Sequence, residues 1–223
     1  MAIRHNKGFT LIEMLVVVGI FAVVATVLLF NYSSFSTSVG VRNLAQEIGL
    51  SVRKAQTYAT SVRNISGTSS VMSDLFPAYG VSFSVNGQSS VPYSPTTTSF
   101  SLFVDASPTN DRVTNNRYDN NGTCGGVPML GQECVENFGI TTGTKIVSLC
   151  TDSPSANSCF TPANGGTVNV VFHRPNPDAV ICVIDGNGNC LGQHASYLKI
   201  TVESPKGLDR IITIWNTGQI SVN

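Results

Sequence analysis

The chain has 223 residues, equal numbers of basic and acidic side chains, and charged residues at only 12 % of its positions. A broad nucleic-acid-binding surface usually raises the pI of a domain above about 9, whereas the pI here is about 6.8, so the composition argues against that class. Abundant Ser, Thr, Asn and Gly are typical of a loop-rich domain outside the cytoplasm rather than of a cytosolic enzyme. The length suffices for one core of ordinary size beside a membrane anchor.

The first predicted element is a membrane-spanning helix over residues Phe9 to Phe30, where nearly every side chain is apolar. About 20 such residues are needed to cross the hydrocarbon core of a bilayer as a helix. The exception is Glu13, because a carboxylate at that depth costs about 2.5–3.5 kcal/mol and is usually paired and functional. Ahead of the segment, Arg4 and Lys7 stand without an acid, which favours a cytoplasmic N-terminus.

Three interpretations of this segment compete: a plain anchor, a secretory signal peptide and a processed subunit. A signal peptide has an apolar region of about 7–15 residues followed by a small-residue cleavage site. Here the apolar run is longer, and no such site follows Phe30. The run Gly8-Phe9-Thr10-Leu11-Ile12-Glu13, after a short basic leader, resembles the cleavage signal of type IV pilins and of the pseudopilins of type II secretion.

The resemblance implies specific chemistry on three residues. A prepilin peptidase in the membrane would cut between Gly8 and Phe9 and would then methylate the new amine of Phe9. Glu13 would offer its carboxylate to the Phe9 amine of a neighbouring subunit, so that the cost of burying a charge is offset only on assembly. The pairing would also set the axial register, as one polar residue does in a coiled-coil core. The simpler alternative is that the Glu13 side chain extends to the membrane surface.

Residues 31–64 continue the helix in amphipathic form. No proline occurs from Phe9 to Asn64, which allows one helix of about 50 residues. The apolar positions recur at spacings of three and four, the pattern of a one-sided helix: Val41, Leu44, Ile48, Val52, Ala55, Ala59 and Val62. This stripe predicts that the second half of the helix packs against a globular domain.

Residues 65–223 carry the signals of strands and turns. Candidate strands are Tyr79–Val85, Phe100–Val104, Lys145–Leu149, Val168–Phe172, Val180–Ile184, Tyr197–Glu203, Asp209–Trp215 and Ile220–Val222. Pro205 and Gly207 make a turn between two of them. The predicted fold class is therefore α+β, with a long N-terminal helix packed on an antiparallel sheet. The last strands also resemble those of H-type minor pseudopilins and similar minor pilins.

All six cysteines lie beyond the membrane segment: Cys124, Cys134, Cys150, Cys159, Cys182 and Cys190. An even number outside the cytoplasm favours disulfides. The simplest scheme joins successive cysteines, so that each bond closes one short, polar loop. The alternatives are free thiols and a zinc site, although no C-x-x-C occurs and the histidines are not spaced with the cysteines as zinc ligands usually are.

Oxygen-rich loops raise the question of calcium, which binds six to eight oxygen atoms. The candidates are Asp105, Asp111 and Asp119, in a stretch that also contains Asn110 and Asn121. A second loop, residues 185–189, begins like an EF-hand but has Cys190 and Ser196 where glycine and glutamate belong. Solvated turns are the favoured interpretation, and no metal or cofactor is expected.

Catalysis finds little support in the sequence. No G-x-S-x-G, H-E-x-x-H or phosphate-binding glycine motif occurs, and His173 or His194 with Asp185 is a combination expected by chance in a serine-rich chain. We expect no enzyme.

The resemblance to pilins instead implies a structural subunit of a type IV pilus or a type II secretion pseudopilus, and the resemblance of the last strands implies a minor component. Its partners would be other pilin or pseudopilin subunits, the prepilin peptidase and the inner-membrane assembly machinery. It would be a single-pass inner-membrane protein with its domain outside the cytoplasm until it enters the filament. The alternative is a minor pilin that binds DNA for uptake, which needs phosphate contacts. The C-terminal strands offer only Lys199, Lys206 and Arg210 for these.

Overall fold

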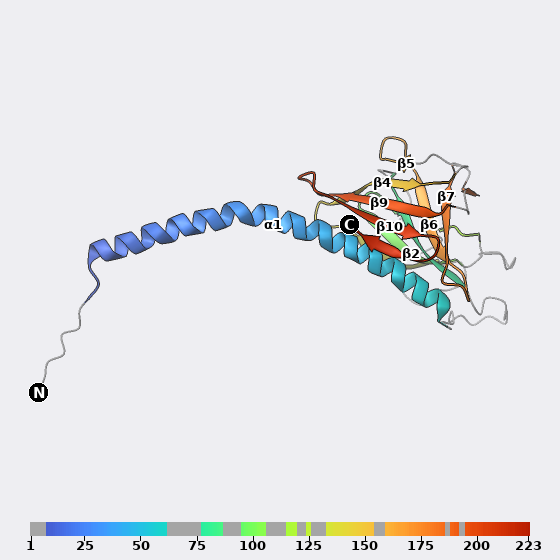
Figure 1. Ribbon diagram of the computed structural model, residues 1–223, viewed down its shortest axis with the longest axis horizontal. Coiled ribbons are helices and arrows are strands. Elements are labelled where there is room, and N and C mark those ends of the chain that lie inside the picture. Colours follow the sequence, from blue (N-terminus) through green and yellow to red (C-terminus); the bar gives the residue numbers. More distant parts are fainter. Residues whose placement is uncertain are drawn as a thin grey trace, which may run out of the picture.

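A long helix carries a β-rich domain on its C-terminal half, while its N-terminal half projects away from that domain (Figure 1). The computed structural model describes residues 8–61, 77–86, 95–105, 115–119, 124–125, 133–153, 159–185, 188–191 and 195–223. The predicted α+β class is confirmed.

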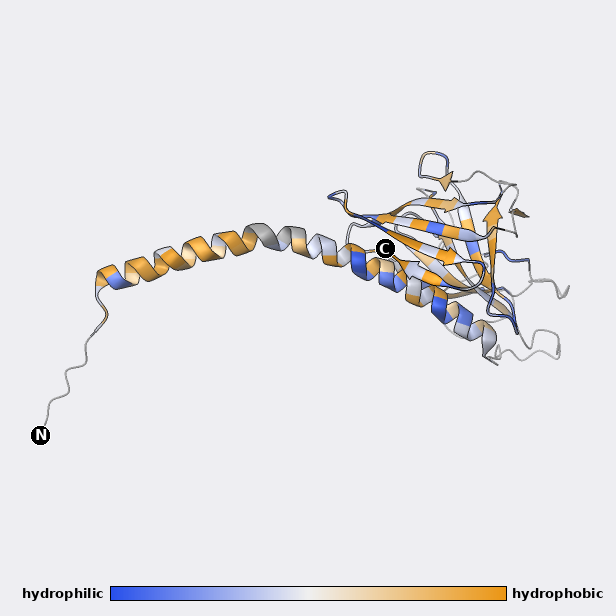
Figure 2. Cartoon of the chain, viewed as in Figure 1, coloured by the Kyte–Doolittle hydropathy of each residue, from blue (hydrophilic) through white to orange (hydrophobic). Residues whose placement is uncertain are grey.

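Helix α1 (Leu11–Thr60) is continuous over 50 residues, which corresponds to about 75 Å at 1.5 Å per residue. Its first half, Leu11–Leu29, is long and apolar enough to cross a membrane, and none of it is buried in the protein. Figure 2 shows this half as apolar on all sides except for one hydrophilic position near its start. A helix that is apolar all round is stable only where lipid or other protein surrounds it.

The second half of α1 is one-sided, as its apolar spacing predicts. The stripe Val41, Leu44, Ala45, Ile48, Val52, Ala55 and Ala59 is at most 4 % exposed. Val62, expected on the same stripe, lies outside the described residues. The helix packs against both sheets, on β1 (Ala78–Ser84) and β6 (Thr167–Phe172) of one and on β10 (Asp209–Trp215) and β11 (Ile220–Val222) of the other.

The strands form two antiparallel sheets. The six-stranded sheet has the order β3-β2-β1-β6-β7-β8, in which β2 is Ser99–Asp105, β3 Cys134–Gly139, β7 Ala179–Ile184 and β8 Cys190–Leu191. The five-stranded sheet has the order β11-β10-β9-β4-β5, in which β4 is Lys145–Thr151, β5 Cys159–Phe160 and β9 Tyr197–Glu203. The eight strands expected from the sequence are all present, whereas β3, β5 and β8 are not expected from it.

The main core lies between the two sheets and the helix. Phe83, Phe100 and Leu102 of the six-stranded sheet and Ile200 and Ile214 of the five-stranded sheet belong to one buried cluster with the helix stripe. The alternation is clear in β9, whose even-numbered residues from 198 to 202 are buried while their neighbours are not. Strand β1 differs, because all seven of its residues are buried. The outer face of the six-stranded sheet is therefore covered at this strand.

Three disulfides lie at sheet edges and leave no free cysteine. Cys124–Cys134 fixes the start of edge strand β3, Cys182–Cys190 joins β7 to edge strand β8, and Cys150–Cys159 joins β4 to edge strand β5. These are the pairs of successive cysteines that the simplest scheme expects. The remaining sheet edge, β11, lies against α1 near Gly49. Since β5 and β8 have two residues each, pairing alone holds them weakly, and the covalent bonds keep them in place.

One glycine in β1 makes room for an aromatic ring. A Cβ atom on Gly80 would lie 2.7 Å from the carbonyl oxygen of Val170 and 2.8 Å from the ring of Phe103. Phe103 belongs to a second small cluster, with Ala78 and Val171, on the outer face of the six-stranded sheet. We therefore predict that Gly80→Ala lowers the free energy of unfolding by about 1–3 kcal/mol, because backbone on a neighbouring strand must move.

The matched control for this prediction is Gly139→Ala, because a Cβ there has nothing within 4 Å. It should change stability by less than about 0.5 kcal/mol. Denaturant titration of the full-length protein in detergent, followed by the fluorescence of its one tryptophan, Trp215, measures both variants. Equal free energies of unfolding for the two variants would show that the contacts of position 80 with Val170 and Phe103 do not exclude a side chain there.

Candidate functional site

The N-terminal end of α1 holds the residues that the sequence singles out. Thr10 is the N-cap of the helix in extended conformation, and its Oγ1 accepts a hydrogen bond from the backbone N–H of Glu13 at 3.3 Å. Threonine at the cap with glutamate three residues later is the capping-box pattern. The helix consequently begins at Leu11. Sequence reasoning missed the role of Thr10, although the spacing of Thr10 and Glu13 was a visible signal.

Gly8 and Phe9 precede the helix and are open to the surroundings. The side chain of Phe9 is 79 % exposed, and a Cβ atom placed on Gly8 would meet nothing within 4 Å. Nothing in the described part of this chain therefore requires glycine at position 8. If glycine is required there, the requirement comes from a molecule that binds the segment.

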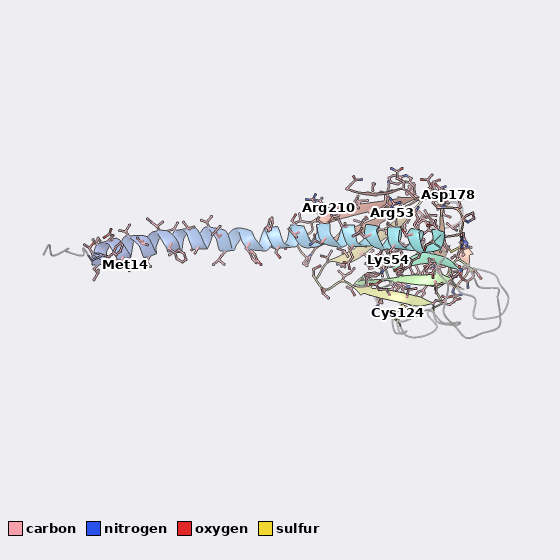
Figure 3. All side chains as sticks on the ribbon, turned by 90° about the horizontal axis from the view of Figure 1, so that it is seen from below. Met14, Arg53, Lys54, Cys124, Asp178 and Arg210 are labelled. Carbon is pink, nitrogen blue, oxygen red and sulfur yellow. A yellow bond between two sulfur atoms is a disulfide. The ribbon has the colours of Figure 1, made fainter. Side chains whose placement is uncertain are left out.

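Glu13 is a carboxylate on an exposed apolar surface, far from the cations of the domain. The first basic residue that follows it along α1 is Arg42, about 40 Å further on at 1.5 Å per residue. Figure 3 shows Met14, the neighbour of Glu13, at the opposite end of the helix from Arg53 and Lys54. The basic leader residues Arg4, His5 and Lys7 lie outside the described residues. The described part of the globular domain thus supplies no counter-charge for Glu13.

Comparison with known families gives one result. Residues 3–29 match the family model of the prokaryotic N-terminal methylation motif. By this segment, the chain is similar to type IV pilins and pseudopilins, and the match supports the resemblance seen in the sequence. The match includes Gly8, Phe9 and Glu13 and does not reach the β domain, so the resemblance of the last strands to H-type subunits gains nothing from it. No curated protein and no solved structure matches the chain.

The match to the methylation motif suggests a structural, non-enzymatic protein, and the described members of the candidate catalytic combination do not lie together. His173 follows the last residue of β6, and Asp185 follows the last residue of β7. Because Thr167 pairs with Ile184 and Phe172 with Ala179, the two side chains belong to opposite ends of a strand pair, about 20 Å apart. His194 lies outside the described residues. Nε2 of His173 instead lies 2.5 Å from Oδ1 of Asn116, and burial lowers the pKa of His173.

The calcium candidates are engaged with nitrogen donors where the structure describes them. The two carboxylate oxygens of Asp105 accept the backbone N–H groups of Asn115 and Asn116 at 3.2 and 2.8 Å. Burial raises the pKa of Asp105 to about 6, against the lowering effect of these hydrogen bonds. Asp119 forms an ion pair with Nε of Arg117 at 2.6 Å. Asp111 lies outside the described residues. Asp105, in β2, therefore holds residues 115–119 against the six-stranded sheet, whereas the Asp119 carboxylate pairs within that segment.

The loop that begins at Asp185 is closed by its own amides. Its Oδ1 accepts the backbone N–H of Asn189 at 2.6 Å, and its Oδ2 accepts the side-chain amide of the same residue at 3.3 Å. Gly186 and Asn187 lie outside the described residues. This arrangement matches the solvated turn that the departures at Cys190 and Ser196 favour.

Proposed function

We propose that the protein is a filament subunit that a prepilin peptidase cuts after Gly8 and methylates on Phe9. Residues 1–8 are then the leader and 9–30 span the inner membrane. Residues 31–64 continue the helix, and 65–223 form the domain outside the cytoplasm. The observation that carries the proposal is the apolar surface of Leu11–Leu29, wholly exposed in the single chain and preceded by the matched motif.

The exposed apolar surface of α1 fits two successive environments, the membrane and the filament. Each large apolar side chain removed from water contributes roughly 1.5–3 kcal/mol, so this half of the helix is stable only in lipid or against other subunits. In the membrane the surface faces acyl chains. In a filament, the same surface faces the helices of neighbouring copies, and the domain stays outside. One continuous helix serves both states.

Glu13 supports assembly rather than the stability of the single chain. No cation in the part of the domain that the structure describes lies near it, because the first basic residue along α1 is about 40 Å away. Cleavage after Gly8 would create a cationic amine on Phe9, four residues before Glu13. In a filament, the Phe9 amine of one subunit would lie beside Glu13 of a neighbouring subunit. A charge-assisted hydrogen bond between the two would offset the cost of the carboxylate and would favour one stagger between subunits.

A minor position in the filament, in a type IV pilus or a type II secretion pseudopilus, is part of the proposal and rests on the resemblance of β9–β11 alone. DNA uptake is not carried forward. Lys199, Lys206 and Arg210 are exposed, but Glu203 and Asp209 lie opposite each other in the same strand pair. A surface with alternating charge does not give the phosphate contacts that DNA binding needs.

The first prediction concerns Gly8. Gly8→Leu should leave the precursor uncut in the membrane, because a branched side chain enters the peptidase cleft where the substrate backbone must pass closely. The variant should fold normally, since a Cβ at Gly8 meets nothing within 4 Å. Immunoblots of membranes from cells that carry the peptidase distinguish the precursor from the chain shortened by its leader.

Gly19→Leu is the matched control, because Gly19 also has open space around it and lies outside the cleavage segment. It should be cut as efficiently as the wild type. Normal cleavage of Gly8→Leu would contradict the assignment of Gly8 as the residue before the cut.

The second prediction concerns Glu13. Glu13→Val should leave membrane insertion and cleavage intact, because it removes a polar side chain from the bilayer. Recovery of the subunit in sheared filaments should fall about tenfold or more, as expected for loss of one partner of a buried charge pair. Quantitative blots of the membrane and filament fractions measure both effects.

Glu47→Val is the control, since Glu47 is an exposed acid on the domain half of the same helix. It should enter filaments at the level of the wild type. If Glu13→Val inserts poorly but the inserted fraction assembles normally, Glu13 serves the single chain, and its proposed pairing with Phe9 is wrong.

A further inference from the structure

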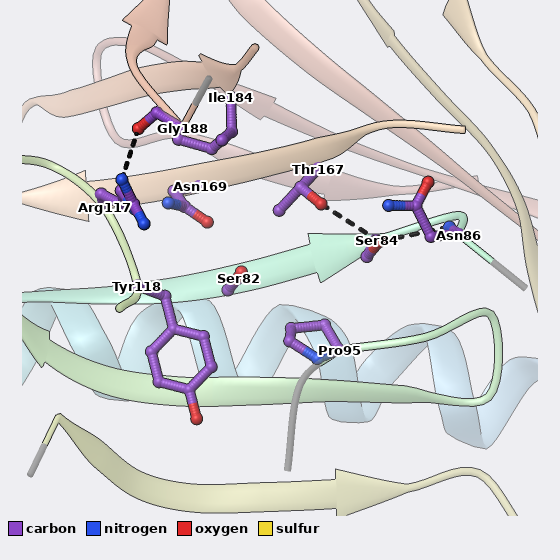
Figure 4. A pocket seen from close by; sticks show the side chains of 10 residues that line it. All are labelled: Ser82, Ser84, Asn86, Pro95, Arg117, Tyr118, Thr167, Asn169, Ile184 and Gly188. Carbon is purple, nitrogen blue, oxygen red and sulfur yellow. Dashed lines mark hydrogen bonds between the residues drawn. The ribbon is translucent and has the colours of Figure 1, made fainter. Parts of the chain in front are cut away.

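A polar pocket of about 220 Å³ lies on the outer face of the six-stranded sheet. Strands β1 and β6 form its floor, and residues from the segments around Pro95 and Arg117 form its rim (Figure 4). Val81 and Phe83 of β1 point into the main core, so Ser82 between them points to the opposite face, away from the helix. The pocket thus lies on the face of the sheet that points away from helix α1.

Two buried polar atoms in the floor have no hydrogen-bond partner among the described residues. They are Oγ of Ser82 and Oδ1 of Asn169, whose residues are 0 % and 1 % exposed. The two residues lie directly opposite each other in the β1–β6 pair. Nδ2 of Asn169 donates to the carbonyl oxygen of Asn116 at 3.2 Å, which fixes the amide and leaves Oδ1 for the pocket. Buried polar atoms without partners are rare in folded proteins, because each costs about 1–3 kcal/mol.

The charge in the rim is already compensated. Arg117 forms its ion pair with Asp119, and its Nη1 donates to the carbonyl oxygen of Gly188 at 2.9 Å. The remaining wall is fixed by hydroxyl groups, since Oγ1 of Thr167 lies 3.1 Å from Oγ of Ser84, which in turn donates to the carbonyl oxygen of Gly166 at 3.2 Å. The pocket therefore presents neutral hydroxyl and amide groups rather than a net charge.

The hydrogen-bond donors and acceptors of the pocket determine which kind of ligand it can bind. A fully ionised anion such as sulfate supplies only acceptors and leaves Oδ1 of Asn169 unsatisfied. A cation such as Ca²⁺ needs six or more oxygen ligands, usually with carboxylates, and no carboxylate is among the described residues that line the pocket. A hydroxyl group satisfies both open atoms, because it can donate to Asn169 and accept from Ser82.

The apolar part of the rim favours a ring that carries several hydroxyl groups. The Tyr118 side chain and Pro95 lie over the floor on the side of β2 (Figure 4). The Tyr118 ring packs on Phe103 with 5.4 Å between centroids, which holds it in place. The volume corresponds to roughly seven water molecules at about 30 Å³ each, below the ~300–1,000 Å³ of sites for drug-sized ligands. We propose that this pocket binds one monosaccharide unit of a neutral sugar.

The test uses the full-length protein in detergent and a panel of D-glucose, D-galactose, D-mannose and N-acetyl-D-glucosamine. Saturation-transfer NMR should detect at least one of these sugars. Ser82→Ala removes one open atom and should weaken that sugar about three- to tenfold, the effect of one hydrogen bond. Ser153→Ala is the matched control, because Ser153 Oγ is also buried without a partner but does not line the pocket. It should bind as the wild type does.

The unfolding temperatures of both variants show whether they are folded. Thr167→Ala changes the wall of the pocket and should also bind the sugar more weakly. Absence of saturation transfer from every sugar to the folded wild type would mean that water alone fills the pocket, and would overturn the proposal. Equal sugar binding by Ser82→Ala and Ser153→Ala would overturn it as well. Binding of sulfate or Ca²⁺, with no sugar bound, would contradict the argument from donors and acceptors. None of these outcomes depends on cleavage or assembly of the subunit.

Discussion

Helix α1 has two apolar surfaces that must leave water, and its own chain covers only one of them. The stripe from Val41 to Ala59 is buried against both sheets, whereas Leu11–Leu29 is exposed all round. Since both surfaces belong to one unbroken helix, whatever covers the first half fixes the position of the domain. The rest of the architecture follows from this constraint: one half of the helix needs lipid or other protein around it, and the other half carries the domain. The proposed burial of the first half between subunits would meet the same need.

The domain is built to be stable in an oxidising, aqueous environment with few charges. Three of its four sheet edges are fixed by disulfides, and the fourth lies against the helix. Open edges invite pairing with other chains, which would compete with ordered assembly of a filament. Short loops closed by covalent bonds remove this risk without a larger core. At the surface, an ion pair between Lys54 and Glu136 also joins the helix to β3.

The features that could be predicted from the sequence are those that depend on residues close together along the chain. The helix and its buried stripe are local patterns, and the β9–β10 hairpin has its turn at Pro205 and Gly207, so the sequence showed both. Strand β3 was missed because its apolar and polar residues do not alternate at an edge, and β5 and β8 are too short to leave a pattern. The two-sheet arrangement depends on pairings such as β1 with β6, which are distant in sequence. The open atoms of Ser82 and Asn169 meet only through that pairing, so no local signal reveals the pocket.

The proposed assembly requires that the chain is matured at its N-terminus before it enters a filament. The most direct measurement is the intact mass of the subunit recovered from sheared filaments, with fragmentation of its N-terminal peptide. The account predicts a chain that begins at Phe9 with one methyl group on its amine. A subunit from assembled filaments that begins at Met1 or Ala2, or whose Phe9 amine carries no methyl group, would contradict it.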